Sequence, residues 1–297
     1  MNRATLIGFS AVLLWALLAL FTVGTSPMPP FQLAALSFAI GGLVGLIWTV
    51  ARSKLSALRD VPPGAYVFGT LGLFGYHALY FSALRLAPPA EASLIAYLWP
   101  LLIVLGSGLL PGEKLRVRHV AGAVIAFTGA ALIVGGRENA GGGISAGHLL
   151  ALGAAVTWAG YSLGSRRMTS VPTEAVTVYC LLTAVLAAGV HLTVETPVWN
   201  LTTAGWLSAL ALGLGPVGLA FFTWDIGVKR GDIQLLGTLA YASPLLSTLV
   251  LVTAGIAPAT TKLLVAALLI TLGAILAAGL FGGGNRGGRR PDSQKTR

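Results

Sequence analysis

Long apolar stretches alternate with short polar gaps along almost the whole chain. Each stretch is close to the ~20 apolar residues that one helical crossing of a bilayer requires. The pattern therefore predicts an all-α membrane protein with ten transmembrane helices. The expected spans cover residues 4–23, 31–51, 64–84, 90–110, 117–136, 146–165, 173–193, 203–226, 233–255 and 261–281.

The lysines and arginines gather in alternate gaps between these stretches. Sixteen of the nineteen fall in one set of gaps and at the two termini, whereas Arg85, Arg137 and Lys262 fall in the other set. Because loops rich in lysine and arginine stay in the cytoplasm, both termini are expected there. This rule also accounts for the net charge of +10. We therefore expect contact with the lipid bilayer and no binding to nucleic acid.

The composition agrees with a membrane protein and excludes a soluble domain. Hydrophobic residues make up 56% of the chain and charged residues 9%, whereas soluble domains carry about 25% charged residues. The single cysteine, Cys180, lies inside an expected span and has no partner for an intrachain disulfide. The polar, glycine- and arginine-rich segment 282–297 is expected to be a disordered tail.

The two halves of the chain resemble each other at a shift of about 143–144 residues. Residues 97–102 (YLWPLL) match residues 241–246 (YASPLL), and Gly129 matches Gly273 in the same register. Short apolar matches arise easily by chance, but several at one shift indicate a true repeat.

The repeat has a geometric consequence for the two halves. Each half holds five expected spans, an odd number, so the second half enters the membrane from the opposite side. We therefore expect an inverted-topology repeat of residues 1–136 and 144–281. Secondary transporters are typically built this way, with the substrate site between the halves near the bilayer midplane.

Paired prolines interrupt the fourth and ninth expected spans. Pro100 and Pro244 occupy equivalent places in the two halves. Proline removes a helical hydrogen bond, and in lipid the freed carbonyl must be satisfied by protein or by a water-filled cavity. Matching breaks point to a transport site, and we expect these prolines to act as hinges. The alternative is an ordinary kinked helix. Pro216 is a third mid-span break, without a counterpart in the first half.

Deep aromatic residues are the main candidates for contact with a solute. Buried tyrosine and tryptophan need a partner for their polar atom, which lipid does not supply. They are expected to face a cavity or, alternatively, to pack in the helical core. An uncharged aromatic cavity suits an apolar or aromatic solute, or a cation over a ring face. The candidate substrate-binding residues are Trp15, His77, Tyr80, Tyr97, Trp99, Trp158, Tyr161 and Tyr241.

Polar residues inside or at the ends of the spans have alternative interpretations. Mid-span His77 is expected to donate to a substrate carboxylate, to change charge near neutral pH, or to be satisfied by a neighbouring helix. Arg85 and Glu91, at the outer ends of two spans, are expected to form a rim pair. His191 lies near the outer edge of the seventh span and is expected to face water.

The sequence contains no enzymatic constellation. The histidines lack metal-ligand spacing, and there is neither a nucleophile–base motif nor a phosphate-binding glycine loop. We therefore expect no enzyme activity, no metal and no cofactor. The alternative from a functional class other than transporters is a membrane-embedded enzyme or a lipid-binding scaffold. No carboxylate lies clearly at mid-depth in a span, which favours facilitated over proton-driven movement, with His77 as the alternative proton site.

Three segments carry a resemblance to a known family. They are residues 78–93 (ALYFSALRLAPPAEAS), residues 97–101 (YLWPL) and residues 112–115 (GEKL). With the inverted repeat, they resemble the drug/metabolite transporter superfamily with EamA-type repeats. Within that superfamily the chain looks like the exporters of aromatic amino acids, in which the prolines matching Pro100 and Pro244 act as bending points.

The resemblance implies a multi-pass transporter of the bacterial inner membrane. It would export aromatic or hydrophobic amino acids by alternating access, as its small-molecule substrates. Related members move other metabolites and drugs, so those cargoes, including cationic drugs and proton-coupled export, remain alternatives. The motifs are specific for fold and transport, and they leave the substrate range and the oligomeric state open.

Overall fold

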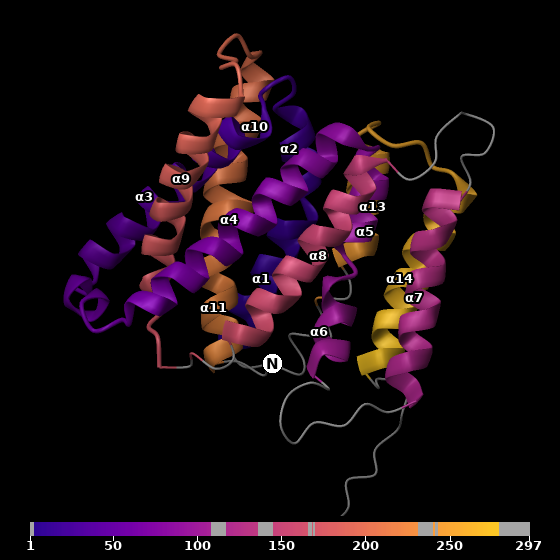
Figure 1. The fold of residues 1–297 in the computed structure, drawn as a ribbon, viewed down its shortest axis with the longest axis horizontal. Helices are drawn as coiled ribbons and strands as arrows, with labels where there is room; N and C mark the ends of the chain where they lie inside the picture. The colour runs from indigo at the N-terminus through magenta and orange to yellow at the C-terminus, as the bar shows by residue number, and fades with distance from the viewer. Residues whose placement is uncertain are drawn as a thin grey trace, which may run out of the picture.

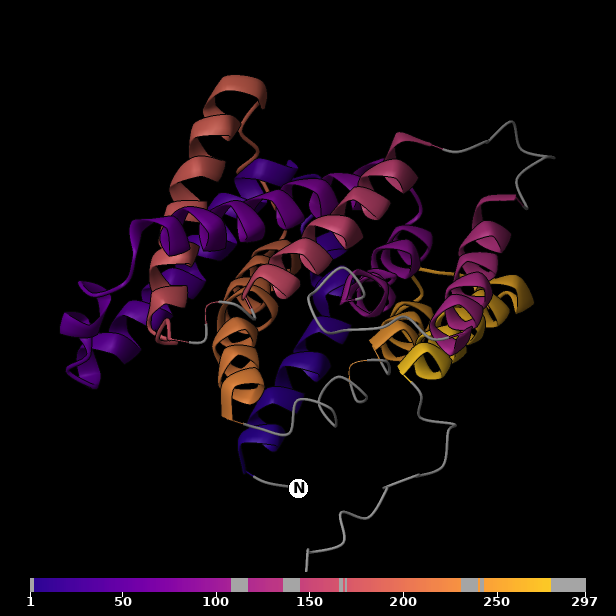
Figure 2. The ribbon, with the colours of Figure 1, turned by 60° about the horizontal axis from the view of Figure 1, so that its bottom comes forward.

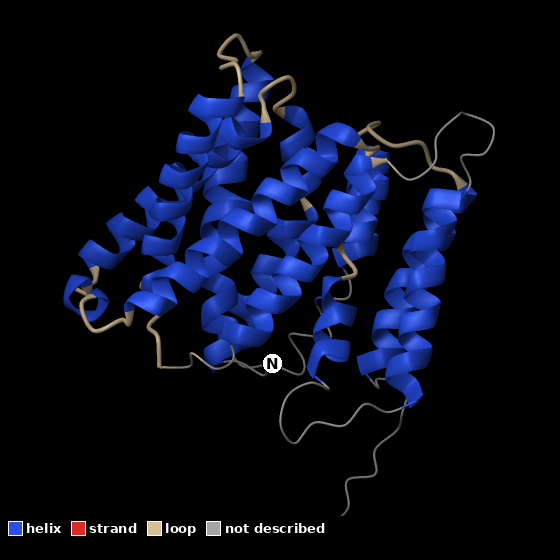
Figure 3. Cartoon of the chain, in the orientation of Figure 1, coloured by secondary structure: helices blue, strands red, loops and turns tan. Residues whose placement is uncertain are grey.

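The computed structural model describes residues 3–107, 117–135, 145–165, 168, 170–230, 240 and 243–278. All regular elements in these ranges are helices, and no strand occurs among the residues described (Figure 3). This confirms the predicted all-α class. The expected tail, residues 282–297, lies outside the described residues.

The helices follow the apolar stretches of the sequence (Figure 1). The first half contains α1 (Arg3–Ala16), α2 (Leu18–Gly24), α3 (Pro30–Ala51), the short η1 (Leu55–Leu58), α4 (Pro63–Leu86), α5 (Pro89–Ala96), α6 (Trp99–Ser107) and α7 (Val117–Gly135). The second half contains α8 (Ala146–Ser165), α9 (Ala175–Val194), α10 (Thr203–Leu214), the π-helical turn η3 (Gly215–Leu219), α11 (Ala220–Arg230), α13 (Ser243–Thr253) and α14 (Thr261–Ala278).

Among the described residues, five helical segments are long and apolar enough to cross a membrane, and they match the first, second, third, seventh and eighth expected spans. The segments are Arg3–Gly24, Pro30–Ala51, Pro63–Leu86, Ala175–Val194 and Thr203–Gly227. The fifth and tenth expected spans contribute shorter apolar segments in the described residues, Val120–Gly129 and Thr261–Gly273.

Helices of one half pack mainly against helices of the other half. The strongest pairings join α7 with α14, α3 with α9, α4 with α8 and α1 with α11. Figures 1 and 2 show α7 and α14 side by side at one edge of the molecule. Exchanging the halves turns the α4–α8 pairing into the α11–α1 pairing and leaves α3–α9 and α7–α14 unchanged. The packing therefore has an approximate two-fold relation between the halves.

Glycines allow α7 and α14 to approach closely. A Cβ atom on Gly273 would lie 2.5 Å from the carbonyl oxygen of Gly122 and 2.6 Å from the amide nitrogen of Ala126. A Cβ atom on Gly129, the repeat equivalent of Gly273, would lie 2.9 Å from the carbonyl oxygen of Ala266. Small residues at such positions let the two backbones pack where lipid offers no hydrophobic driving force between helices.

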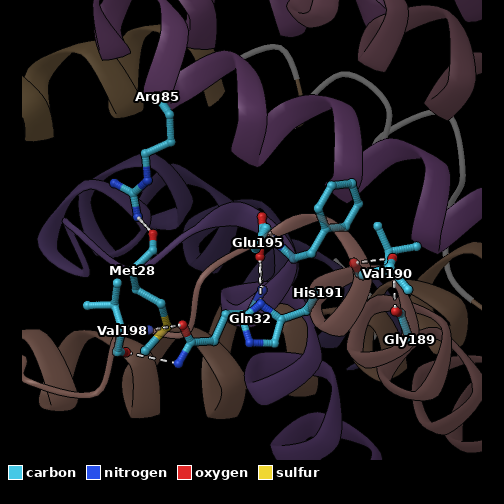
Figure 4. Close-up of polar contacts among 10 residues, drawn as sticks. Met28, Gln32, Arg85, Gly189, Val190, His191, Glu195 and Val198 are labelled. Atoms are coloured by element: carbon cyan, nitrogen blue, oxygen red, sulfur yellow. Dashed lines mark hydrogen bonds and ion pairs between the residues drawn. The ribbon is translucent and has the colours of Figure 1, made fainter.

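A polar clamp joins the start of α3 to the end of α9 (Figure 4). The Glu195 carboxylate accepts hydrogen bonds from the backbone amides of Phe31, at 2.9 Å, and Gln32, at 3.0 Å. The Nδ1–H group of His191 donates to the same carboxylate at 2.8 Å. Glu195 therefore satisfies the free amides and complements the dipole at the first turn of α3.

The clamp corrects the expectation for His191. This side chain is buried, with 6% of its surface exposed, and does not face water. A second pair of bonds strengthens the junction: Gln32 Nε2 donates to the Val198 carbonyl at 2.9 Å, and the Val198 amide donates to Gln32 Oε1 at 2.8 Å. Since α3 and α9 belong to different halves, the clamp ties the halves together.

Replacing Glu195 by glutamine is expected to lower the free energy of unfolding by about 1–3 kcal/mol, the cost of leaving buried donors without an acceptor. The amide keeps the shape of the side chain but turns a donor toward backbone N–H groups. Thermal unfolding of the purified protein in detergent measures the change. Glu174→Gln is the control, because Glu174 precedes the other end of α9 and its side chain makes no capping bond. Equal unfolding temperatures for both variants would contradict the clamp.

Candidate functional site

The fourth expected span is interrupted next to its proline. Helix α5 ends at Ala96, Tyr97 and Leu98 form a turn, and α6 begins at Trp99 with Pro100 in its first turn. In the second half, α13 begins at Ser243 with Pro244 in its first turn. The two helices thus begin at equivalent places of the repeat. In each helix the proline lies in the first turn, where a backbone N–H group would have no acceptor within the helix, so proline removes no hydrogen bond of that helix.

Trp15 joins three interrupted spans through hydrogen bonds. Helix α1 ends at Ala16, next to Trp15, and the Trp15 carbonyl accepts a bond from the Tyr97 hydroxyl at 3.0 Å. The indole Nε1–H group of Trp15 donates to the carbonyl of Pro216 at 3.1 Å. Pro216 lies in the π-helical turn η3, so Trp15 connects the breaks of the first, fourth and eighth expected spans. Side-chain donors thereby satisfy backbone carbonyls that would accept bonds from backbone N–H groups in a continuous helix.

Trp158 lies at the centre of an aromatic cluster formed by both halves. Its ring packs edge-on against Trp15, with 5.7 Å between the ring centroids. Such edge-to-face and tilted pairs are the favoured aromatic geometries, and they give the cluster a defined shape. The other rings within the cluster, with their centroid distances from Trp158, are Tyr76 (5.1 Å), Tyr161 (5.3 Å), Phe221 (5.8 Å) and Trp99 (6.4 Å).

The cluster surrounds a small cavity. The cavity has a volume of about 20 Å³, which is room for about one water molecule. None of the described residues that line it is acidic, lysine or arginine, and they come from five of the expected spans. An aromatic amino acid would enter only if these rings moved apart, so the described arrangement is contracted around the cavity. The lining residues are Trp15, Leu18, Tyr76, His77, Tyr97, Trp99, Trp158 and Phe221.

His77 lines the cavity and is bonded within its own helix. Its Nδ1–H group donates to the Leu73 carbonyl, one turn earlier in α4, at 2.9 Å. The neutral ring then carries its lone pair on Nε2. The rings of Phe38 and Phe81 pack against it with centroids at 4.7 Å and 5.2 Å. In its neutral form the imidazole then offers an acceptor at Nε2, which suits an ammonium group, whereas the protonated form offers a donor there, which suits a carboxylate.

The structure brings most of the candidate residues together. Trp15, His77, Tyr97, Trp99 and Trp158 line the cavity.

Two candidates lie one layer behind the lining. Tyr80 stacks on Tyr76 with 5.6 Å between centroids, and its hydroxyl lies 2.9 Å from Ser93 Oγ. Tyr161 packs against Trp158 and stacks on Phe68 at 5.6 Å. Tyr241 lies outside the described residues.

Sequence reasoning missed three lining residues. Tyr76 is an aromatic residue inside the third expected span that was not among the candidates, and Leu18 and Phe221 carry no polar atom that requires a partner. Phe221 follows the turn at Pro216, and this break was the one signal that could have indicated it. A purely apolar side chain has no pattern that separates cavity lining from helix packing.

Two further charged positions differ from expectation. Arg85 does not pair with Glu91: its Nη2 donates to Thr25 Oγ1 at 2.9 Å. The same group donates to the Met28 carbonyl at 3.0 Å (Figure 4). Glu91 accepts a hydrogen bond from Nε2 of His148 at 3.1 Å. The predicted rim pair is therefore wrong, because each partner finds a closer group on a neighbouring helix or loop.

Two helical halves that meet around an uncharged aromatic cavity define a membrane transporter. The chain belongs to the EamA-like transporter family, whose sequence model matches residues 2–135 and 145–279. The two matches confirm that two EamA repeats are present.

Similar proteins are named for a narrower function. Over 280 residues the chain is 54% identical to the aromatic amino acid exporter YddG of Ancylobacter novellus. This alignment covers 93% of this chain and 97% of that protein. It is 29% identical to YddG of Salmonella typhimurium, over 83% of this chain and 87% of that protein. A crystal structure of a protein 52% identical in sequence matches with a TM-score of 0.76, covering 94% of this chain and 98% of that one.

Proposed function

We propose that this protein exports aromatic and hydrophobic amino acids across the bacterial inner membrane by alternating access. The observation that carries the proposal is the cavity where the two halves meet, which aromatic rings line and where His77 is the one acidic or basic group among the described lining residues. An aromatic side chain packs well against such rings. The names of the similar proteins support the same substrate class.

The proposed topology has ten spans with both termini in the cytoplasm. Residues 1–136 and 144–281 would form two repeats of opposite orientation, followed by the tail 282–297. The two-fold relation among the helix pairings supports this arrangement, as does the distribution of lysine and arginine between the loops. Two halves of similar shape and opposite orientation have two nearly equivalent arrangements, one open on each side of the membrane.

In the proposed complex, the aromatic side chain of the substrate lies among the rings of Trp15, Trp99 and Trp158. The lone pair on Nε2 of His77 accepts a bond from the substrate ammonium group. The hydroxyl of Tyr97 donates to the substrate carboxylate after exchanging its bond to the Trp15 carbonyl. Tyr80 and Tyr161 support the lining rings from behind, and Tyr241 is proposed as the counterpart of Tyr97 in the second repeat.

The proposed motion is bending at Pro100 and Pro244. At the first site the interruption at Tyr97 and Leu98 already separates α5 from α6, so a change of angle there breaks few helical hydrogen bonds. Bending would widen the contracted cavity toward one side while the other side closes. Because no carboxylate lines the cavity among the described residues, we propose that the substrate gradient drives export without proton coupling.

Pro100→Ala is expected to slow export by about tenfold or more while lowering stability little, because alanine restores a continuous helix and raises the barrier to bending. Initial rates in proteoliposomes, normalised to the amount of inserted protein, measure the effect. Pro197→Ala is the control, since Pro197 is exposed in the loop between α9 and α10. A normal export rate of the Pro100→Ala variant would contradict the proposal that Pro100 is a hinge.

Uptake into proteoliposomes of purified protein tests the function itself. Labelled phenylalanine or tryptophan is supplied with and without an imposed pH gradient. We expect saturable uptake that is indifferent to the gradient. Accumulation driven by the gradient would instead make His77 the leading proton site. Absence of amino-acid uptake, together with transport of a cationic dye, would replace the proposal by drug export.

A further inference from the structure

A second and larger cavity lies away from the aromatic cluster. Its volume is about 300 Å³, within the range of sites that bind small molecules. It opens between the start of α5, in the first half, and the loop and first turn of α14, in the second half. Its walls are mostly apolar, and they include Pro88, Pro89, Ile256, Pro258 and Leu263. In the proposed topology this is the outer face, where exported solute leaves.

Two residues of opposite charge line this cavity. Glu91 lines it from α5 and Lys262 lines it from α14. Lys262 is one of three lysines and arginines placed on the side where the orientation rule disfavours them. Of the other two, Arg85 is bound to Thr25 and Met28, and Arg137 lies outside the described residues. Lys262 thus places a positive charge at the wall of a cavity that a carboxylate also lines.

His148 holds the Glu91 carboxylate in place. The backbone amide of Ser145 donates to His148 Nδ1 at 3.1 Å, so the neutral ring carries its proton on Nε2. That Nε2–H group donates to Oε2 of Glu91 at 3.1 Å. The carboxylate is thus an acceptor in a fixed position, tied by α8 of the second half to α5 of the first.

We infer that this cavity is a second amino-acid site on the exit side of the transporter. Glu91 would accept hydrogen bonds from the ammonium group, Lys262 would donate to the carboxylate, and the apolar walls would contact the side chain. A zwitterion with an apolar side chain matches all three features. The inference rests on the proposed function, because it takes the same substrate to be bound again after leaving the central cavity.

Equilibrium binding of labelled phenylalanine to the purified protein tests the inference. The protein is placed in nanodiscs of phosphatidylcholine and phosphatidylglycerol. We expect two sites per chain, with one lost in Glu91→Gln and in Lys262→Gln, because losing one charge-assisted contact weakens a site by about tenfold or more. Lys54→Gln and Glu174→Gln are the controls, and they should keep both sites.

Two analogues separate the contributions of the two charges. Labelled 2-phenylethylamine lacks the carboxylate, so its own binding at the second site should disappear in Glu91→Gln and persist in Lys262→Gln. Labelled 3-phenylpropanoate lacks the ammonium group and should show the reverse pattern. Binding of either analogue that is the same in both variants would overturn the assignment.

A phosphatidylethanolamine headgroup also combines an ammonium group with an anion, so it is a second possible occupant of this cavity. A second set of nanodiscs that contains this lipid distinguishes a lipid headgroup from a free amino acid as the ligand. Two phenylalanine sites in discs without this lipid support the inference. A single phenylalanine site in those discs, unaffected by Glu91→Gln and Lys262→Gln, overturns it while leaving the proposed function intact. Absence of both binding and proteoliposome uptake would instead defeat the proposed function.

Discussion

Trp158→Ala is expected to abolish amino-acid export and to weaken phenylalanine binding at the central cavity by about tenfold or more. The Trp158 ring packs against rings from both halves, including Trp15, Tyr76 and Phe221 at centroid distances of 5.7, 5.1 and 5.8 Å. Its removal enlarges the contracted cavity and deletes a wall of the proposed site. The free energy of unfolding should also fall by about 3–5 kcal/mol, as for other buried tryptophans.

The loss of export must be separated from the loss of stability. Trp158→Phe keeps an aromatic ring at this place and should fold nearly as well as the parent, with export reduced and the KM for phenylalanine raised. Trp206→Ala is the matched control, because Trp206 is partly exposed and stacks on Trp199 far from the cavity. Normal export by well-folded Trp158→Ala would show that the aromatic cluster is only core packing.

Gly273→Leu is expected to prevent stable folding. The first added carbon would lie 2.5 Å from the Gly122 carbonyl oxygen and 2.6 Å from the Ala126 amide nitrogen, so α14 must move away from α7 along its length. Backbone atoms cannot give way as a flexible side chain can, and overpacking of this kind costs at least about 1–3 kcal/mol. The yield of monodisperse protein in detergent and its unfolding temperature measure the effect.

Gly189→Leu is the control for this substitution. Gly189 lies in α9, is exposed, and has no atom within 4 Å of the place where a Cβ would stand. The control should keep its yield and unfolding temperature. If Gly273→Leu behaved in the same way, the close approach of α7 and α14 would not be required for the fold.

Much of the fold could be predicted from local patterns in the sequence. Apolar stretches of membrane length predicted helices, and the shift of about 144 residues predicted that Gly129 and Gly273 occupy equivalent places. The helices confirm the all-α class, and the glycines lie in the same α7–α14 contact. Proline at residue 100 also pointed to the interruption before α6, since its effect on a helix depends only on neighbouring residues.

The candidate site was predictable only in part. Tyrosine and tryptophan deep in a span draw attention because their polar atoms need partners, and this found Trp15, Tyr97 and Trp158. Phe221 and Leu18 give no such signal, although they line the same cavity. The incorrect rim pair has a related cause, because the partners of Arg85 and Glu91 lie far away along the chain: Thr25 and Met28 for Arg85, and His148 for Glu91.

The sequence by itself determined the helices, the repeat and the family, because hydrophobic length, charge distribution and proline act through residues that are close along the chain. The tertiary structure alone decided which groups meet. Trp15 bonds the carbonyl of Pro216, 201 residues away, and Glu195 caps a helix that begins 165 residues earlier. Such contacts depend on how the two halves pack across their interface. The pattern of apolar residues within either half therefore does not predict which residues of the other half they contact.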